Sequence, residues 1–175
     1  MQLTVRELLD SDIHHIVGYF IDADPDFLRG MGADVNKLPK RKDWIRKLQL
    51  ELAKPYLEKN YYYIIWLLDA QPIGHSNVNN ITFGESANMH LHIWKSEHRK
   101  GGLGVQFLRQ TIPLYFERLS LKKLVCEPYS ENPAPNKILQ KLGFQFVRTY
   151  ETTPGIINFR QTVNRYELKK EDFMP

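Results

Sequence analysis

Six residues near the middle of the chain, from Arg99 to Gly104, constrain the fold more than any other segment. Three glycines occupy four successive positions here, at Gly101, Gly102 and Gly104. The segment follows an alternating apolar run that ends at Trp94 and precedes an apolar pattern with helical spacing. Glycines let the backbone approach a ligand closely, and the free amides at a helix N-terminus favour an anion. The pattern therefore predicts a strand–loop–helix unit whose loop binds a phosphate or pyrophosphate.

Two common phosphate-binding loops are excluded by the residues that follow. A Walker loop ends in Gly-Lys-Ser or Gly-Lys-Thr, whereas this one continues as Gly104-Val105-Gln106. The dinucleotide-binding fingerprint needs a small residue where Phe107 stands, and it normally follows the first strand of its domain. The ligand is therefore expected to be a different phosphate compound.

The periodicity of the remaining chain predicts a mixed α/β fold. Period-two alternation and apolar runs predict strands at 3–8, 61–68, 73–81, 87–94, 123–129, 144–151 and 160–168. Helical spacing predicts helices that begin near residues 10 and 43 and that cover 103–119 and 133–142. We expect a mostly antiparallel sheet of six to seven strands with helices on both faces.

Residues 22–40 lack a sustained period and are expected to form a long, partly ordered connection. It is either a loop that covers the substrate or a passive surface loop. The segment contains four aspartates, Asp22, Asp24, Asp26 and Asp34. They either attract a cationic amine or belong to a solvated loop.

Composition limits the cellular compartment and the classes of partner that are expected for this protein. The 175 residues suit a single domain spanning 1–175. No apolar run approaches the ~20 residues that a membrane span needs, and residues 1–6 lack the features of a signal peptide. The lone Cys126 fits a reducing compartment, so we expect a cytoplasmic protein without a membrane partner. A net charge of +4 is mild, and because no segment resembles a base-reading motif, a nucleic-acid partner is not expected.

Two spaced motifs resemble a known superfamily. The pattern Arg-x-x-Gly-x-Gly at Arg99, Gly102 and Gly104 resembles the acetyl-CoA pyrophosphate loop of the GCN-related N-acetyltransferase (GNAT) superfamily. Asn132, followed by Lys141-Leu142-Gly143-Phe144, is similar to its second cofactor segment. Residues 115–124 are similar to the Rim-type branch, which includes N-terminal acetyltransferases of ribosomal proteins.

This resemblance implies a GNAT-like sheet with a splayed central strand pair, here 87–94 and 123–129, and acetyl-CoA as acyl donor. The pantetheine arm would lie in the gap, beside the backbone of Ile93 and Trp94. Asn132 would hydrogen-bond the arm, although Asn132 before Pro133 is also ordinary helix-start chemistry. The residues expected at the pyrophosphate are Arg99, Lys100, Gly101, Gly102, Leu103 and Gly104.

Two histidines are the candidate general bases. Acetyl transfer needs a deprotonated amine, a polarised thioester carbonyl and a protonated leaving thiolate. Period-two geometry places His90 and His92 on one face of strand 87–94, just before the glycine loop. Glu127 on the facing strand is the alternative base, and Glu85 is a more remote one. No further ligands stand at metal-binding spacing, so no metal is expected.

The general acid is the weakest part of the match. The superfamily often places a tyrosine or a serine at the positions that hold Leu139 and Pro135 here, and neither residue can donate a proton. Tyr129, Ser130 and Cys126 are nearby candidates, and Tyr129 is our choice.

The expected activity is direct transfer of acetyl from acetyl-CoA to a primary amine, with assistance from a general base. The acceptor is a peptide N-terminus or a small amine, and the sequence does not distinguish them. The alternative is a non-catalytic acyl-CoA-binding regulatory or partner domain, suggested by the missing acid residues. A homodimer is left open.

Overall fold

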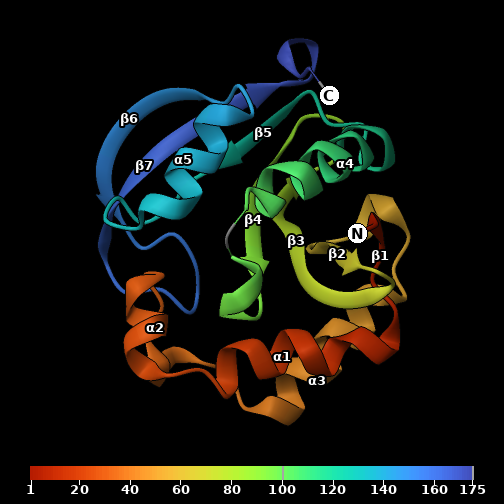
Figure 1. The fold of residues 1–175 in the computed structure, drawn as a ribbon, viewed down its shortest axis with the longest axis vertical. Coiled ribbons are helices and arrows are strands. Elements are labelled where there is room, and N and C mark those ends of the chain that lie inside the picture. Colours follow the sequence, from red (N-terminus) through yellow and green to blue (C-terminus); the bar gives the residue numbers. More distant parts are fainter. Residues whose placement is uncertain (100, 175) are drawn as a thin grey trace.

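The computed structural model describes residues 1–99 and 101–174. In this part of the chain, seven strands form one sheet in the order β1-β2-β3-β4-β5-β7-β6 (Figure 1). The β4–β5 pair is parallel and the other neighbouring pairs are antiparallel. The expected mixed, mostly antiparallel sheet is thus confirmed. The strands are β1 (Leu3–Glu7), β2 (Tyr62–Leu68), β3 (Gln71–Thr82), β4 (Ser86–Ile93), β5 (Lys123–Cys126), β6 (Gln145–Thr152) and β7 (Gln161–Lys169).

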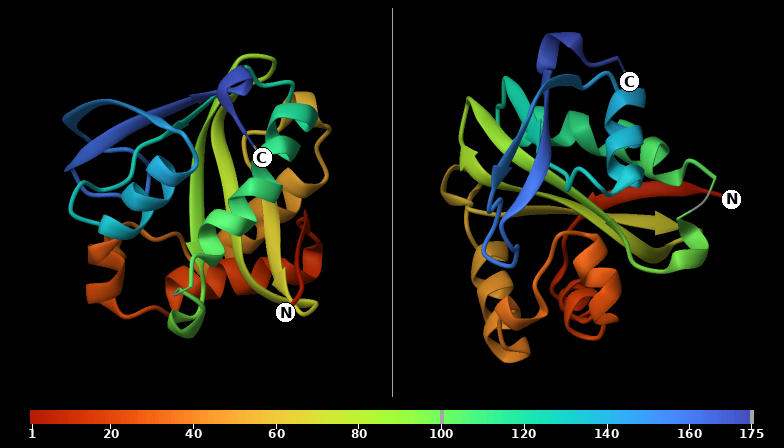
Figure 2. Two further views of the ribbon diagram at one scale, coloured as in Figure 1. Left: turned by 45° about the horizontal axis from the view of Figure 1, so that its top comes forward. Right: turned by 90° about the vertical axis from the view of Figure 1, so that its left-hand side faces the viewer.

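Helices cover both faces of the sheet, as expected (Figure 2). The first three α-helices lie on one face, and α4 and α5 lie on the other. They are α1 (Ile13–Ile21), α2 (Pro25–Gly30), α3 (Arg41–Leu52), α4 (Leu103–Arg118) and α5 (Pro133–Lys141), and the short 3-10 helices are η1 (Asp10–Asp12), η2 (Val35–Lys37), η3 (Tyr56–Glu58), η4 (Ser96–His98) and η5 (Lys170–Asp172). Over residues 1–99 and 101–174, no helix has both the length and the apolar character that crossing a bilayer requires.

Side chains of β2 contribute to two hydrophobic clusters, one on each face of the sheet. Alternate side chains, such as Ile64 and Trp66, pack toward α4 and α5, while Ile65 packs toward α1 and α3. Trp66 stacks on Phe107 with ring centroids 5.1 Å apart, and its Nε1 donates to Thr111 Oγ1 at 3.0 Å. Burial on both faces explains why the sequence of this strand is almost continuously apolar.

Strands β4 and β5 pair only at their beginning. Their register ends with Asn88 opposite Val125, although β4 continues to Ile93. Just beyond the last pair, Cys126 Sγ donates to the Met89 carbonyl at 3.0 Å. The splayed strand pair is therefore confirmed, and the predicted strand 123–129 is too long because β5 ends at Cys126.

Residues 22–40, expected to form a long, partly ordered connection, contain short helices that the sequence analysis missed. The segment contains α2 and η2, and it is joined to the β6–β7 loop by a hydrogen bond from Asp34 N to Ile157 O at 2.7 Å. The Asp24 carboxylate caps α2 by accepting from the amides of Asp26 and Phe27, and Pro25 occupies the first helical turn. An Asp-Pro pair is a helix-start pattern, but six helical residues are too few for a visible apolar period.

We expect Gly74→Ala to destabilise the protein by at least about 2 kcal/mol, because it overpacks a backbone contact. A Cβ at this position of β3 would lie 2.5 Å from the His92 carbonyl oxygen, which belongs to the neighbouring strand. Urea denaturation measures the loss. The matched control is Gly30→Ala at the end of α2, where no described atom lies within 4 Å of the added Cβ. An equal loss in both variants would contradict the close strand contact.

Candidate functional site

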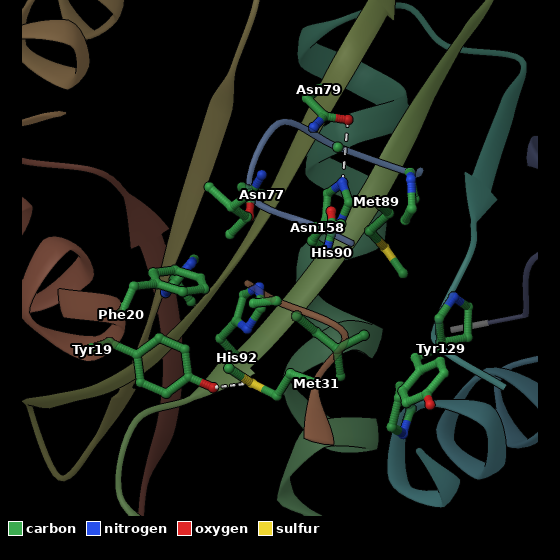
Figure 3. Close-up of a pocket in the computed structure, with 18 of the residues that line it drawn as sticks. Tyr19, Phe20, Met31, Asn77, Asn79, Met89, His90, His92, Tyr129 and Asn158 are labelled. Carbon is green, nitrogen blue, oxygen red and sulfur yellow. Dashed lines mark hydrogen bonds between the residues drawn. The ribbon is translucent and has the colours of Figure 1, made fainter. Parts of the chain in front are cut away.

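A cavity of about 410 Å³ opens where β4 and β5 part, on the face of the sheet covered by α1–α3 (Figure 3). Its walls come from α1, α2, α3, β2, β3, β4, the segment after β5, the start of α5 and the β6–β7 loop. Segments far apart in the sequence therefore share one enclosure, of a size typical of small-molecule sites.

His90 and His92 both line this cavity. Met89 belongs to the core cluster on the α4 side, so the alternation along β4 turns the two histidines away from that core. Asn79 Oδ1 lies 3.2 Å from His90 Nε2. Because an amide oxygen only accepts, Nε2 carries the hydrogen in this arrangement and Nδ1 keeps the lone pair.

Burial keeps both imidazoles neutral. It lowers the pKa of His90 to about 4, against an ordinary value near 6.5, while the nearby Glu127 carboxylate acts in the opposite direction. Burial also lowers the pKa of His92 well below 6.5, and the neighbouring His75, His90 and Arg99 add to that effect. At neutral pH each ring therefore offers a lone pair without a charge.

A third histidine, His75 on β3, was missed by the sequence analysis. Trp94 Nε1 donates to its Nδ1 at 2.8 Å, and the rings of His75 and His92 lie 4.9 Å apart. Burial lowers the pKa of His75 to about 3. The available signal was the period-two spacing of His75, Asn77 and Asn79 along one strand, which places the three polar side chains on one face.

Glu127, the alternative base, lines the cavity just after β5 but is already engaged. Its Oε1 accepts from Arg165 Nη1 at 2.8 Å and from the Tyr150 hydroxyl. Arg165 also binds Glu167 at 2.7 Å. A carboxylate held by a cation and a phenol is poorly suited to collect a proton from the acceptor.

The candidate acids differ in their environments. Tyr129 lines the cavity, and partial burial with the Glu131 carboxylate raises the pKa of its phenol, so it stays protonated at neutral pH. Burial raises the pKa of the Cys126 thiol to about 12, which leaves Cys126 unsuited to act as a nucleophile. Leu139, at a position where the superfamily often has a proton donor, is an apolar residue fully buried in the core.

The glycines of the loop have separate roles. Gly101 and Gly102 have φ angles of +81° and +75°, and no described atom lies within 4 Å of a Cβ built on either. Gly102 forms the N-cap of α4, and Leu103 begins the helix. A Cβ on Gly104 would meet Ile138 Cδ1 at 2.9 Å, so this glycine lets α4 pack against α5. Lys100, also expected at the pyrophosphate, lies outside the described residues.

Arg99 is an exposed residue that contributes to the cavity lining. Its Nε donates to the Ile93 carbonyl at 3.0 Å, and its Nη2 donates to the Trp94 carbonyl at 3.1 Å. Its guanidinium carbon lies 4.2 Å from the centre of the Phe27 ring. The side chain therefore occupies the end of β4, where the resemblance predicts the pantetheine arm.

Asn132 lies at the N-cap position of α5, before Pro133, and lines the cavity. Among the described residues, its side chain caps no amide of the helix. Asn136, which the sequence analysis missed, holds this segment by donating to the carbonyls of Asn132 at 2.7 Å and Tyr129 at 3.1 Å. Asn132 thus lines the cavity with a side-chain amide that does not cap the helix.

The described residues contain no cluster of three or more His, Cys, Asp or Glu side chains arranged for a metal ion.

The three cavity histidines predict a pH-dependent stability. Their folded pKa values lie below the unfolded value near 6.5, so the unfolded chain binds more protons and stability falls as the pH drops below 6.5. We expect each of the three to contribute up to about 1.4 kcal/mol per pH unit between pH 6.5 and 5, above the main range of carboxylate titration. Denaturant unfolding over this range measures the slope.

The variant His92→Gln should make this slope shallower by one histidine's share. Comparison with the unmodified protein at pH 8, where imidazole is neutral in both states, removes the direct effect on packing. An unchanged slope would contradict the neutral state of His92 over the pH range of the slope.

Comparisons with known proteins agree with this geometry. A family model described as "Acetyltransferase (GNAT) domain" matches residues 2–145. No curated protein sequence matches the chain. Among solved structures, the chain is similar to RimL, a ribosomal-protein alpha-N-acetyltransferase in complex with coenzyme A, with a TM-score of 0.77, 13% identity, and coverage of 97% of this chain and 94% of the other.

Two Vibrio structures are similarly close. A ribosomal-protein alanine acetyltransferase from Vibrio fischeri gives a TM-score of 0.76 at 18% identity, covering 100% of this chain and 97% of the other. A spermidine N-acetyltransferase from Vibrio cholerae, in complex with CoA and spermine, gives 0.79 at 18% identity, covering 98% and 97%. These likenesses establish a shared fold. Because the family model spans the sheet through the start of β6, including the glycine loop and the three cavity histidines, the chain belongs to the acetyltransferase (GNAT) domain family.

Proposed function

We propose that the chain forms one cytoplasmic N-acetyltransferase domain that moves acetyl from acetyl-CoA to a primary amine. The observation that carries this proposal is the parting of β4 and β5 after Asn88 and Val125. It opens into a cavity lined by three neutral histidines, and the open glycine turn at the start of α4 follows β4 in the chain. Complexes of similar folds with CoA add support for this donor.

The residues present fit acetyl-CoA. Gly101 and Gly102 leave open space on the loop, and the first amides of α4 have no partner inside the helix, which suits a pyrophosphate. The carbonyl of Ile93 and the amide of Asn132 would hold the pantetheine arm between the strands. Arg99 would leave the Ile93 and Trp94 carbonyls when the arm binds, and its guanidinium would then be available to the phosphates.

Two of the cavity histidines would assist the transfer. The amine nitrogen forms a bond to the thioester carbonyl carbon, the C–S bond breaks, and one amine proton must be removed. His92 is the preferred base because its ring lies among His75, Phe20 and Tyr19 and makes no hydrogen bond to a described residue. His90, held by Asn79, is the second candidate. The protonated phenol of Tyr129 would supply a proton to the departing thiolate.

We expect Gly102→Ala to weaken acetyl-CoA binding about tenfold, because a methyl group would enter the space proposed for the pyrophosphate, a loss of about 1.4 kcal/mol. Gly84→Ala is the matched control: Gly84 also has a positive φ, +78°, with open space around its Cβ, but it lies in the turn between β3 and β4 and not in the glycine loop before α4. Both variants should lose about 1–2 kcal/mol of stability from the left-handed backbone. Calorimetric titration measures Kd, and equal Kd values in the two variants would count against the proposed loop.

The activity itself is tested by release of CoA thiol across a panel of amines and peptides. His92→Gln, and to a lesser degree His90→Gln, should lower kcat by about 10²–10⁴-fold, the usual contribution of a general base, with little change in acetyl-CoA affinity. His14→Gln, on the exposed side of α1, is the control that should leave kcat unchanged. Tight acetyl-CoA binding without turnover of any acceptor would instead favour the non-catalytic acyl-CoA-binding alternative.

A further inference from the structure

The chemistry of the cavity wall points to a class of acceptor. We propose that the acceptor is a small primary monoamine carrying an aryl or bulky alkyl group, rather than a polyamine or a peptide N-terminus. This inference rests on the proposed acetyl transfer and deepens it, because it concerns the acceptor end of the same cavity.

An aromatic wall, defined here as Tyr19, Phe20, Phe27 and Trp44, lines the cavity beside His92. Phe20 and Tyr19 place their ring centroids 5.1 Å and 5.4 Å from that of His92. Phe20 also lies 5.2 Å from Trp44, and Tyr19 lies 6.0 Å from Phe27, so the four rings form one continuous surface. Such a wall next to the preferred base suits an apolar group attached directly to the reacting amine.

The cavity offers little to a polycation. Among the described residues that line it, Glu127 is the only carboxylate, whereas Lys47 and Arg99 are cations. The Glu127 charge is already neutralised by Arg165, and burial holds the neighbouring histidines neutral. A second or third ammonium group would therefore enter the cavity without an anionic partner, which is costly in a buried site.

The aspartates of residues 22–40 do not supply that partner. Asp22 pairs with Arg41, Asp24 caps α2, and Asp34 accepts from the Asn36 amide. These three aspartates and Asp26 lie outside the cavity lining. The expectation that they attract a cationic amine into the site therefore finds no support in their positions.

Hydrogen bonds also close one side of the cavity. Gly32 accepts from Asn158 Nδ2 at 2.9 Å and from Gln161 Nε2 at 2.7 Å, and Asp34 N donates to Ile157 O at 2.7 Å. These three hydrogen bonds, called the seam here, join the segment after α2 to the β6–β7 loop and the start of β7. A Cβ on Gly32 would lie 2.2 Å from Gln161 Oε1, so the contact tolerates no side chain there. A cavity of about 410 Å³ that is bounded on this side and also admits the acetyl end of the donor suits a compact acceptor better than an extended peptide.

The test compares acceptors at equal concentration with the full chain and acetyl-CoA. The panel contains 2-phenylethylamine, n-hexylamine, spermidine, kanamycin and short peptides with a free N-terminal serine or alanine. Release of CoA thiol and the mass of the acetylated product are both measured. We expect kcat/KM for the two hydrophobic monoamines to exceed the others by at least about tenfold, the scale on which an apolar pocket discriminates.

A charge added to the aromatic side of the cavity should change this preference. Met31 lines the cavity, and its Sδ accepts from the Tyr19 hydroxyl at 3.1 Å. Met31→Glu should raise kcat/KM for spermidine relative to 2-phenylethylamine by about tenfold or more, a change of about 1.4 kcal/mol in relative transition-state binding. Met31→Gln, which has the same length and can also accept a hydrogen bond but is uncharged, should leave spermidine disfavoured.

The outcomes separate this inference from the proposed function. Faster turnover of spermidine, kanamycin or a peptide than of both monoamines would overturn the acceptor class while leaving acetyl transfer intact. An equal response of the two Met31 variants would overturn the charge argument. Binding of acetyl-CoA by calorimetry with no turnover of any acceptor would overturn the proposed function and this inference together.

Discussion

The parting of β4 and β5 is the feature on which the rest of the site depends. The two strands are the parallel neighbours in the sheet, and they pair over three positions before they separate. Beyond Asn88, β4 still pairs with β3 but loses its partner on the β5 side, and buried backbone groups on that side require other partners. The Cys126 thiol satisfies the Met89 carbonyl, and Arg99 satisfies those of Ile93 and Trp94. The remaining edge faces the cavity and is suited to a ligand that can hydrogen-bond to it.

The same burial that stabilises the fold prepares the histidines for chemistry. His75, His90 and His92 lie on adjacent strands, and helices α1 and α3 cover this face of the sheet. Removing them from water disfavours the imidazolium form and lowers all three pKa values. Each ring is then a neutral acceptor at physiological pH, at a cost in stability under acidic conditions. The proposed catalytic groups and the acid sensitivity of the fold thus have one physical origin.

Local patterns predicted local structure well and distant contacts poorly. The glycine loop before α4 and the alternation along β4 depend on neighbouring residues, so the sequence predicted the loop's place before a helix and the common face of His90 and His92. His75 was missed because it stands on a different strand, and its position beside His92 depends on the β3–β4 register. The helix α2 was missed because six residues are too short for a helical period, and its seam to Ile157 spans more than a hundred residues of chain.

The sequence by itself determined the family-level features: the strand and helix order, the glycine turn at a helix start, and the pair of histidines on one strand face. These follow from backbone preferences and side-chain periodicity, which act over a few residues. Only the tertiary structure decided the state and surroundings of the site. In the folded chain, Glu127 pairs with Arg165, and Arg99 donates to the Ile93 carbonyl at the cavity. The aspartates of the α2 region lie outside the cavity lining, and the four rings of the aromatic wall come together within it. Those outcomes depend on which distant side chains meet and on how much water they exclude, and neither is a property of a local pattern.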